Sequence, residues 1–151
     1  MKKPSVERDS DGFYVDTHAG RLRGDEVGSL EELSDKIEQN MPRPEEFLEA
    51  WKDGVSLAGS NYFKIRSDSV ESATDKDELR PDLEVITSCL GAISPGERVF
   101  LLSMYQFFSD STVRDLCVEF GFEFPTLADI ANLDFSHRTI ISRLIDSYCG
   151  W

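Results

Sequence analysis

The feature that most constrains the fold is a capped, apolar helix in the second half of the chain. Ser94 is followed by Pro95 and, three residues after the serine, by Glu97, which is the pattern of an N-terminal capping box with proline in the first helical turn. Eight of the ten residues at 99–108 are apolar. A helix that is apolar on nearly every side must be enclosed by other elements. We therefore expect a helical core around it.

The neighbouring segments supply the elements that would enclose this helix. Apolar residues at helical spacing predict four further helices between residues 81 and 149, with hydroxyl caps expected at Thr112, Thr126 and Ser136. The loops between them are short, which favours neighbouring helices that pack against one another. We expect a compact five-helix C-terminal bundle over residues 80–151.

The N-terminal part has mixed character. Residues 1–11 are charged and expected to be loose, and the polar, acidic segment 67–79 is expected to be a linker or an exposed loop. Strand and helix patterns between them predict a small β-β-α-α-β lobe over residues 1–66. Its elements are two strands at 12–16 and 20–23, helices beginning at 29 and 44, and a strand at 62–66. The fold class is α+β, predominantly α, and one continuous domain is the alternative to two.

Acidity is the main compositional signal for function. The 151 residues carry a formal charge of −13, with 12 Lys/Arg and 19 Asp/Glu in residues 1–80 and 4 and 10 in residues 81–151. The negative charge is therefore spread over the chain. It disfavours direct nucleic-acid binding and anionic membranes, and favours a protein partner with a basic surface. Solubility alone is the simpler interpretation of the same charge.

Cysteines and targeting patterns point to a reducing compartment. Cys89, Cys117 and Cys149 are widely spaced on apolar helical faces, which predicts buried free thiols and no structural zinc. No signal-peptide pattern is visible, and the longest apolar stretch is half the length of a membrane span. We expect a cytoplasmic protein without a membrane segment, metal or cofactor.

Two segments superficially resemble functional motifs. Residues 7–18 resemble a calcium loop, but His18 occupies the position where a glutamate should bind the ion, so a turn before a strand is the simpler interpretation. Residues 112–133 resemble a helix-turn-helix. No Lys or Arg occurs at 122–132, whereas DNA affinity depends on neutralising phosphates. A structural helix pair is the better interpretation.

The remaining candidates concern catalysis and partner binding. His18 and His137 are the available general bases, and no catalytic pattern surrounds either of them. Five short helices need fewer aromatic residues than the set Phe107, Phe108, Phe120, Phe122, Phe124 and Trp151. Phe122 and Phe124 therefore either plug the end of the bundle or form an exposed patch. The residues that we predict to bind a partner are Phe122, Glu123, Phe124, Trp151, Glu45, Glu46 and Glu49.

The hypothesis that the sequence favours is a small acidic, non-enzymatic protein-interaction domain. An inhibitor, an immunity-type protein, an adaptor or a nucleic-acid mimic would each fit an acidic surface that binds a basic partner. A homodimer is compatible with it. The alternatives are an enzyme whose site is assembled from dispersed His, Asp and Glu residues, and a helix-turn-helix-like regulator.

Overall fold

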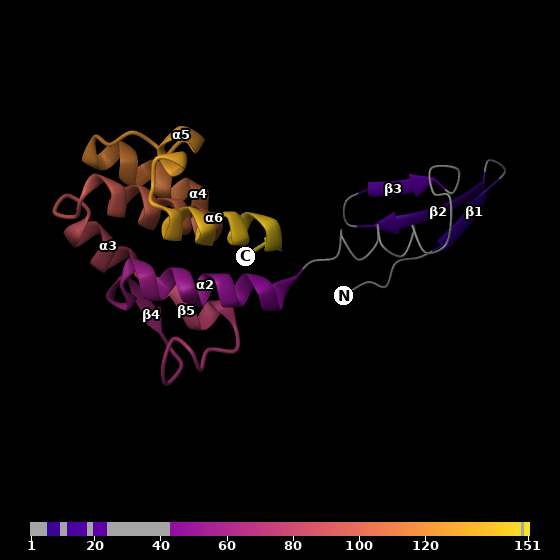
Figure 1. Cartoon of the computed structure of the whole chain (residues 1–151), viewed down its shortest axis with the longest axis horizontal. Coiled ribbons are helices and arrows are strands. Elements are labelled where there is room, and N and C mark those ends of the chain that lie inside the picture. The colour runs from indigo at the N-terminus through magenta and orange to yellow at the C-terminus, as the bar shows by residue number, and fades with distance from the viewer. Residues whose placement is uncertain (1–5, 10–11, 18–19, 24–42, 149) are drawn as a thin grey trace. The chain divides into compact units, whose positions relative to one another are not determined.

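The structure, a computed structural model, describes residues 6–9, 12–17, 20–23, 43–148 and 150–151 (Figure 1). Contacts within the chain divide it into two units, Met1–Pro42 and Arg43–Trp151. This division falls before the second predicted helix of the N-terminal lobe, whereas the predicted linker at 67–79 lies inside the second unit.

The first unit contains a three-stranded antiparallel sheet. Its strands β1 (Val6–Asp9), β2 (Gly12–Thr17) and β3 (Gly20–Arg23) are ordered β1-β2-β3 along the sheet. The prediction that residues 1–11 are loose is wrong for β1, which pairs with β2 in antiparallel register. The calcium-loop-like segment thus lies largely in strands. The helix predicted to begin at Ser29 lies outside the described residues.

The second unit is mainly helical, as predicted, and carries a small two-stranded antiparallel sheet. Its longer elements are α2 (Pro44–Ala58), β4 (Phe63–Ile65), β5 (Leu79–Pro81), α3 (Leu83–Cys89), α4 (Pro95–Phe120), α5 (Leu127–Ala131) and α6 (Phe135–Ser147). Two single turns of 3-10 helix, η2 (Ser60–Tyr62) and η3 (Lys76–Glu78), connect them. Strand β4 pairs with β5, and α2 packs against α6. The helix predicted to begin at residue 44 and the strand predicted at 62–66, which we assigned to the N-terminal lobe, therefore belong to the helical unit as α2 and β4.

Two of the predicted helix caps are confirmed. The Ser94 hydroxyl accepts from the backbone N–H of Glu97 at 3.3 Å, and the Glu97 carboxylate accepts from the backbone N–H of Ser94 at 3.0 Å. Thr126 and Asp129 form the same capping box at the start of α5. Helix α4 ends at Gly121, whose φ of 68° is a left-handed conformation that glycine adopts without strain.

The other two caps were predicted too late in the sequence. Ser109 has non-helical dihedrals (φ −155°, ψ 96°) inside α4, and its hydroxyl accepts from the backbone N–H of Thr112 at 3.4 Å. The predicted helices at 95–108 and 112–120 are thus two parts of α4 that meet at this kink. Asp134, not Ser136, caps α6, because its carboxylate accepts from the backbone N–H of His137 at 3.1 Å. Aspartate caps a helix as well as a hydroxyl does.

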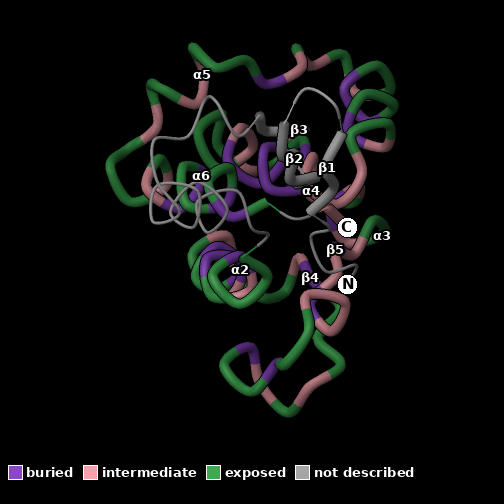
Figure 2. Tube along the Cα trace, turned by 90° about the vertical axis from the view of Figure 1, so that its right-hand side faces the viewer, coloured by how far each residue is buried: buried purple, intermediate pink, exposed green. Residues whose placement is uncertain are grey.

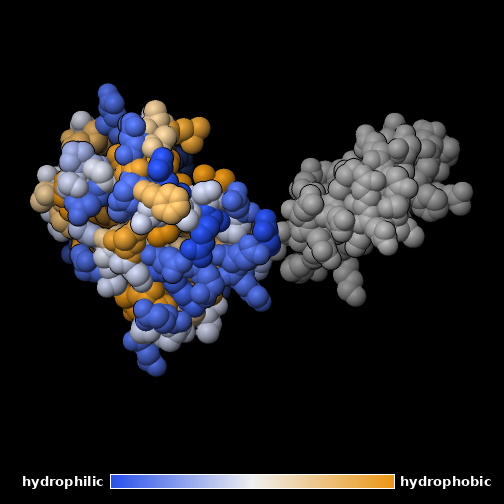
Figure 3. All heavy atoms as spheres, viewed as in Figure 1, coloured by the Kyte–Doolittle hydropathy of each residue, from blue (hydrophilic) through white to orange (hydrophobic). Residues whose placement is uncertain are grey.

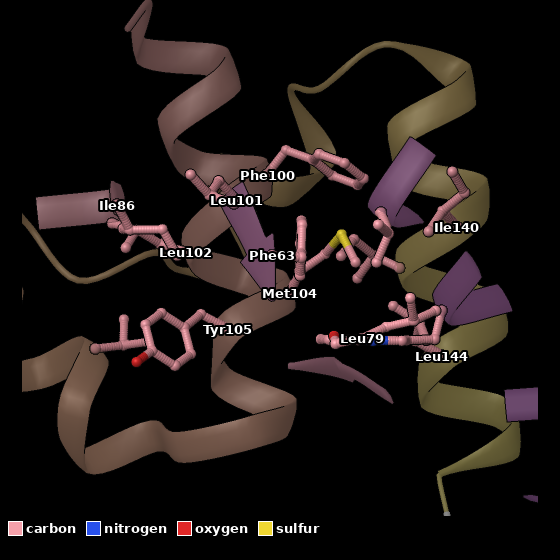
Figure 4. Close-up of a cluster of buried hydrophobic side chains, with 14 of the residues drawn as sticks. Phe63, Leu79, Ile86, Phe100, Leu101, Leu102, Met104, Tyr105, Ile140 and Leu144 are labelled. Carbon is pink, nitrogen blue, oxygen red and sulfur yellow. Dashed lines mark hydrogen bonds between the residues drawn. The ribbon is translucent and has the colours of Figure 1, made fainter. Parts of the chain in front are cut away.

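The core lies between the first part of α4 and the helices around it (Figure 2). All six residues at 100–105 are buried, which confirms the prediction of an enclosed central helix. Phe100 and Met104 project from α4 toward Ile140 and Leu144 of α6 (Figure 4). Because α4 contributes side chains in several directions, it determines how the other helices are arranged.

A glycine allows α2 to pack closely against this core. A Cβ atom on Gly54 would lie 2.5 Å from Met104 Cε and 3.2 Å from Ile140 Cγ2. Both distances are shorter than ordinary van der Waals contact, so a side chain at this position would push against buried atoms of α4 and α6. The glycine thus keeps α2 and α6 close together.

Candidate functional site

Helices α2 and α6 run antiparallel along one face of the second unit (Figure 1). At one end, the Arg43 guanidinium donates to the backbone carbonyl of Asp146 at 3.5 Å. In the middle, Arg143 and Asp53 form an ion pair at 2.5 Å. We call this surface the α2–α6 face; it holds two hollows, and a third opens beside it.

The first hollow, which we call the acidic hollow, lies over the start of α2 and the end of α6. It has a volume of about 380 Å³ and is lined by Arg43, Glu45, Glu46, Glu49, Arg143, Asp146 and Ser147. The three glutamates predicted from the sequence come together here because their spacing places them on neighbouring positions of the helix surface. Hydrophilic residues gather over this part of the unit (Figure 3).

The charges in the acidic hollow are only partly compensated. Arg43 pairs with Glu46 at 3.0 Å, and Glu49 pairs with Lys52 at 2.9 Å. Among residues 43–148 and 150–151, neither Glu45 nor Asp146 has an ion-pair partner. The hollow therefore presents net negative charge to solvent.

The second hollow, which we call the apolar hollow, lies at the opposite end of the same two helices. Its volume is about 550 Å³, and its lining residues are Asp53, Ser56, Leu57, Phe135, Ser136, Thr139 and Ile140. Leu57 is 42% exposed and Phe135 is 76% exposed. Exposed apolar side chains beside a concave surface are typical of a binding site.

The third hollow, which we call the histidine pocket, has a volume of about 170 Å³. It is lined by Leu57, Ala58, Tyr62, Ile93, Glu97, Phe100, Leu101 and His137. Leu57 also lines the apolar hollow, so the two lie next to each other. The sequence named His137 as a candidate base, and the structure places it in this pocket.

Asp134 fixes the orientation of the His137 ring. Its Oδ2 lies 2.6 Å from Nδ1 of the imidazole. The pKa of the Asp134 carboxyl is lowered, first because it accepts a hydrogen bond from the backbone N–H of His137. An ionised carboxylate only accepts, so Nδ1 carries a proton, and in the neutral form of the ring Nε2 is then an acceptor. The ring also makes an edge contact with Phe100, with centroids 4.3 Å apart.

The predicted residues Phe122, Glu123 and Phe124 lie in the connector between α4 and α5. Both aromatic rings are half-buried and Glu123 is exposed. The guanidinium of Arg98 lies 3.8 Å from the centroid of Phe122, and that of Arg114 lies 4.2 Å from Phe124. Each ring is thus covered on one side by an arginine of α4, an interaction that the sequence pattern did not indicate.

The predicted residue Trp151 belongs to an aromatic cluster. Its ring centroid lies 4.9 Å from those of Trp51 and Phe108, and its indole N–H donates to Asp77 at 3.0 Å. The Lys76 ammonium lies 5.1 Å from the same ring. These contacts hold Trp151 half-buried against the unit, and it is not among the residues that line the acidic hollow.

Other functional patterns find no support in the part of the chain that the structure describes. There, no group of three or more His, Cys, Asp or Glu residues is placed to hold a metal ion. Burial raises the pKa of the Cys117 thiol, which makes it less reactive. The short helix α5 contains no Lys or Arg that would contact DNA. None of the described helices is both long and apolar enough to cross a membrane.

Comparison of the chain with protein-family models, with characterised proteins and with solved structures found no match.

Proposed function

We propose that this chain is a non-enzymatic interaction protein that binds a basic partner across the α2–α6 face. The observation that carries the proposal is the pair of hollows on the same two helices, one acidic and one apolar. An apolar contact surrounded by charged groups is the usual composition of a protein interface, in which the apolar part provides affinity and the charges provide specificity.

The charge of the second unit supports the choice of partner. Residues 43–151 contain 19 Asp/Glu and 10 Lys/Arg, a net charge of −9. A field of this sign accelerates association with a positively charged surface and slows association with nucleic acid. Salt screens the attraction, so the affinity for such a partner decreases as ionic strength rises.

The same face fits several roles. An inhibitor, an immunity-type protein, an adaptor or a mimic of nucleic acid would each use acidic side chains against a basic surface. From its sequence pattern we also propose that the protein is cytoplasmic. The β-β-α-α-β arrangement of residues 1–66 is likewise a proposal based on the sequence.

A second candidate function is favoured by the histidine pocket. An imidazole oriented by a carboxylate is a common general base, and His137 and Asp134 form such a pair. No Ser, Thr or Cys lines the pocket, so an enzyme there would activate water or a group on the substrate. A substrate that is turned over by the wild type and not by His137→Phe would favour this candidate.

The first proposal is tested by capturing the partner and comparing variants. The tagged chain is exposed to a lysate of its native cells at low salt, and bound protein is eluted with increasing salt. We expect a stoichiometric, Lys/Arg-rich partner that elutes earlier from a Glu45→Gln, Glu46→Gln, Glu49→Gln variant. Dissociation constants of the purified complex at two salt concentrations quantify the change.

A matched control removes the same charge elsewhere. Glu84, Asp115 and Glu119 are exposed and lie outside the three hollows. A Glu84→Gln, Asp115→Asn, Glu119→Gln variant should elute close to the wild type. It lowers the net negative charge of the protein by the same three units, but it leaves the side chains of the α2–α6 face unchanged. Equal weakening by both variants, or no stoichiometric partner at low salt, would refute the proposal.

A further inference from the structure

The histidine pocket has the size of a single aromatic side chain. Its volume is about 170 Å³, and an apolar cavity of roughly 150 Å³ holds a benzene ring. It adjoins the α2–α6 face at Leu57, which lines both the pocket and the apolar hollow. A partner lying on the face would therefore place a side chain at its entrance.

The pocket has an apolar floor and a polar rim. Phe100 and Leu101 are 1% and 2% exposed and form the floor, whereas Leu57 and Glu97 are exposed at the rim. His137 is intermediate, with 20% of its side chain exposed. A side chain that enters must be apolar at its tip and polar partway along its length.

Two of the three polar side chains that line the pocket, His137 and Glu97, offer hydrogen-bond acceptors, and the third, Tyr62, can both donate and accept. Nε2 of His137 is an acceptor in the neutral ring, and it has no hydrogen-bond partner among the described residues. The Glu97 carboxylate accepts from the backbone N–H of Ser94 through Oε2, and a carboxylate has lone pairs for further hydrogen bonds. The complementary side chain therefore carries a hydrogen-bond donor.

We propose that the histidine pocket binds the indole ring of a tryptophan side chain on the partner. An indole has its N–H on the side of the ring system, at the height of the rim acceptors, and an apolar edge that reaches the floor. A phenol is less suitable, because its hydroxyl would lie against Phe100 and Leu101. The inference rests on the proposed function for the identity of the ligand, since the partner would carry the tryptophan.

The pocket can be tested without the partner. Free indole is titrated into the ¹⁵N-labelled chain, with benzofuran as a ring of the same shape that lacks the donor and p-cresol as the phenol. We expect indole to shift the amide signals of residues around Ile93, Phe100 and His137. One neutral hydrogen bond predicts that it binds roughly three- to tenfold more tightly than benzofuran.

Variants distinguish the pocket from unspecific binding. His137→Phe keeps a ring against Phe100 and removes one of the two acceptors, so the preference for indole over benzofuran should shrink. Ala58→Phe fills the pocket and should abolish the shifts; a melting curve for each variant shows whether it is folded. Equal wild-type affinity for indole and benzofuran, tighter binding of p-cresol, or shifts elsewhere would overturn the inference. If indole binds as expected but the capture experiment returns no basic partner, the proposed function is refuted and the assignment of the pocket to an indole ring is not.

Discussion

The two sides of α2 differ in what they contribute. Toward the core, Phe47, Trp51 and Val55 are at most 1% exposed. On the other side, Glu45 and Leu57 are exposed and line hollows. Stability and binding are therefore carried by different side chains of one helix, so mutations can separate the two properties.

Helix α6 is divided in the same way. Ile140, Ile141 and Leu144 are buried in the core, whereas Phe135 and Asp146 at its two ends are exposed. At one end of the α2–α6 face, Asp146 of α6 lies beside the glutamates of α2, and at the other end Phe135 of α6 lies beside Leu57 of α2. The face therefore has a direction: a bound segment should place its basic residues at one end and its apolar residues at the other.

The largest expected effect comes from the inner side of α2. Trp51 is fully buried, contacts Phe47, Phe63 and Trp151, and donates its indole N–H to the backbone carbonyl of Leu79 at 3.0 Å. We expect Trp51→Ala to lower the free energy of unfolding by about 3–5 kcal/mol. Urea denaturation followed by circular dichroism measures it.

The control for this prediction lies on the outer side of the same helix. Leu57→Ala should cost less than about 1 kcal/mol, because the side chain is already 42% exposed. Similar losses for the two variants would contradict the division between an inner and an outer side.

A second, smaller effect concerns binding without stability. Phe135 is 76% exposed, so Phe135→Ala should change the free energy of unfolding by less than about 0.5 kcal/mol. As an exposed aromatic residue of the apolar hollow, it should nevertheless contribute about 2 kcal/mol to binding, which corresponds to roughly a 30-fold loss of affinity. Calorimetry with the captured partner measures this. Val118→Ala, at a position 84% exposed on α4, is the control and should leave affinity unchanged.

A third effect sharpens the role of the α6 cap. Asp134→Ala removes the acceptor for the backbone N–H of His137 and should lower the melting temperature. Asp134→Asn keeps a cap and should melt closer to the wild type. If the alanine and asparagine variants melt together below the wild type, the carboxylate rather than the cap is what stabilises α6.

The smallest effect is a dependence of stability on pH. The pKa values of Glu97, Asp129 and Asp134 are lowered, mainly by hydrogen bonds that their carboxylates accept at helix starts. Because the folded-state values lie below the ordinary values of 4.5 and 3.8, this stability is present at neutral pH. It is lost as pH falls through the folded-state values.

Melting temperatures measured from pH 6 down to pH 2 test this dependence. Below about pH 4.5 the melting temperature should decrease, and Asp134→Asn should decrease less steeply. A melting temperature that rises as pH falls would contradict the prediction that these carboxylates stabilise the fold in their ionised form.

Patterns local in the sequence predicted much of the helical unit. The Ser94–Glu97 capping box and the apolar residues at 99–108 predicted the central helix, because capping and periodicity act within a few residues. The caps at Thr112 and Ser136 failed because Ser109 and Asp134, slightly earlier, also satisfy the free backbone N–H groups. At each helix start the sequence contains two residues that can cap, and the local pattern does not decide between them.

The candidate site was only partly predictable. Glu45, Glu46 and Glu49 are close in sequence and thus close on the helix. Their neighbour Asp146 comes from a helix about a hundred residues later, so only the packing of α6 on α2 reveals the hollow. Phe135 was missed because periodicity does not distinguish an apolar residue at a helix end from one in the core. Trp151, which the sequence predicts to bind a partner, lies half-buried in an aromatic cluster that the sequence did not indicate.

The most direct test of the central claim is hydrogen–deuterium exchange of the chain, alone and in complex with its captured partner. The claim predicts that amide exchange slows in α2 and α6, at residues 44–58 and 135–147, and that Glu84→Gln, Asp115→Asn, Glu119→Gln leaves the protected segments unchanged. Protection confined to the Phe122–Phe124 connector, or to residues 6–23, would contradict it.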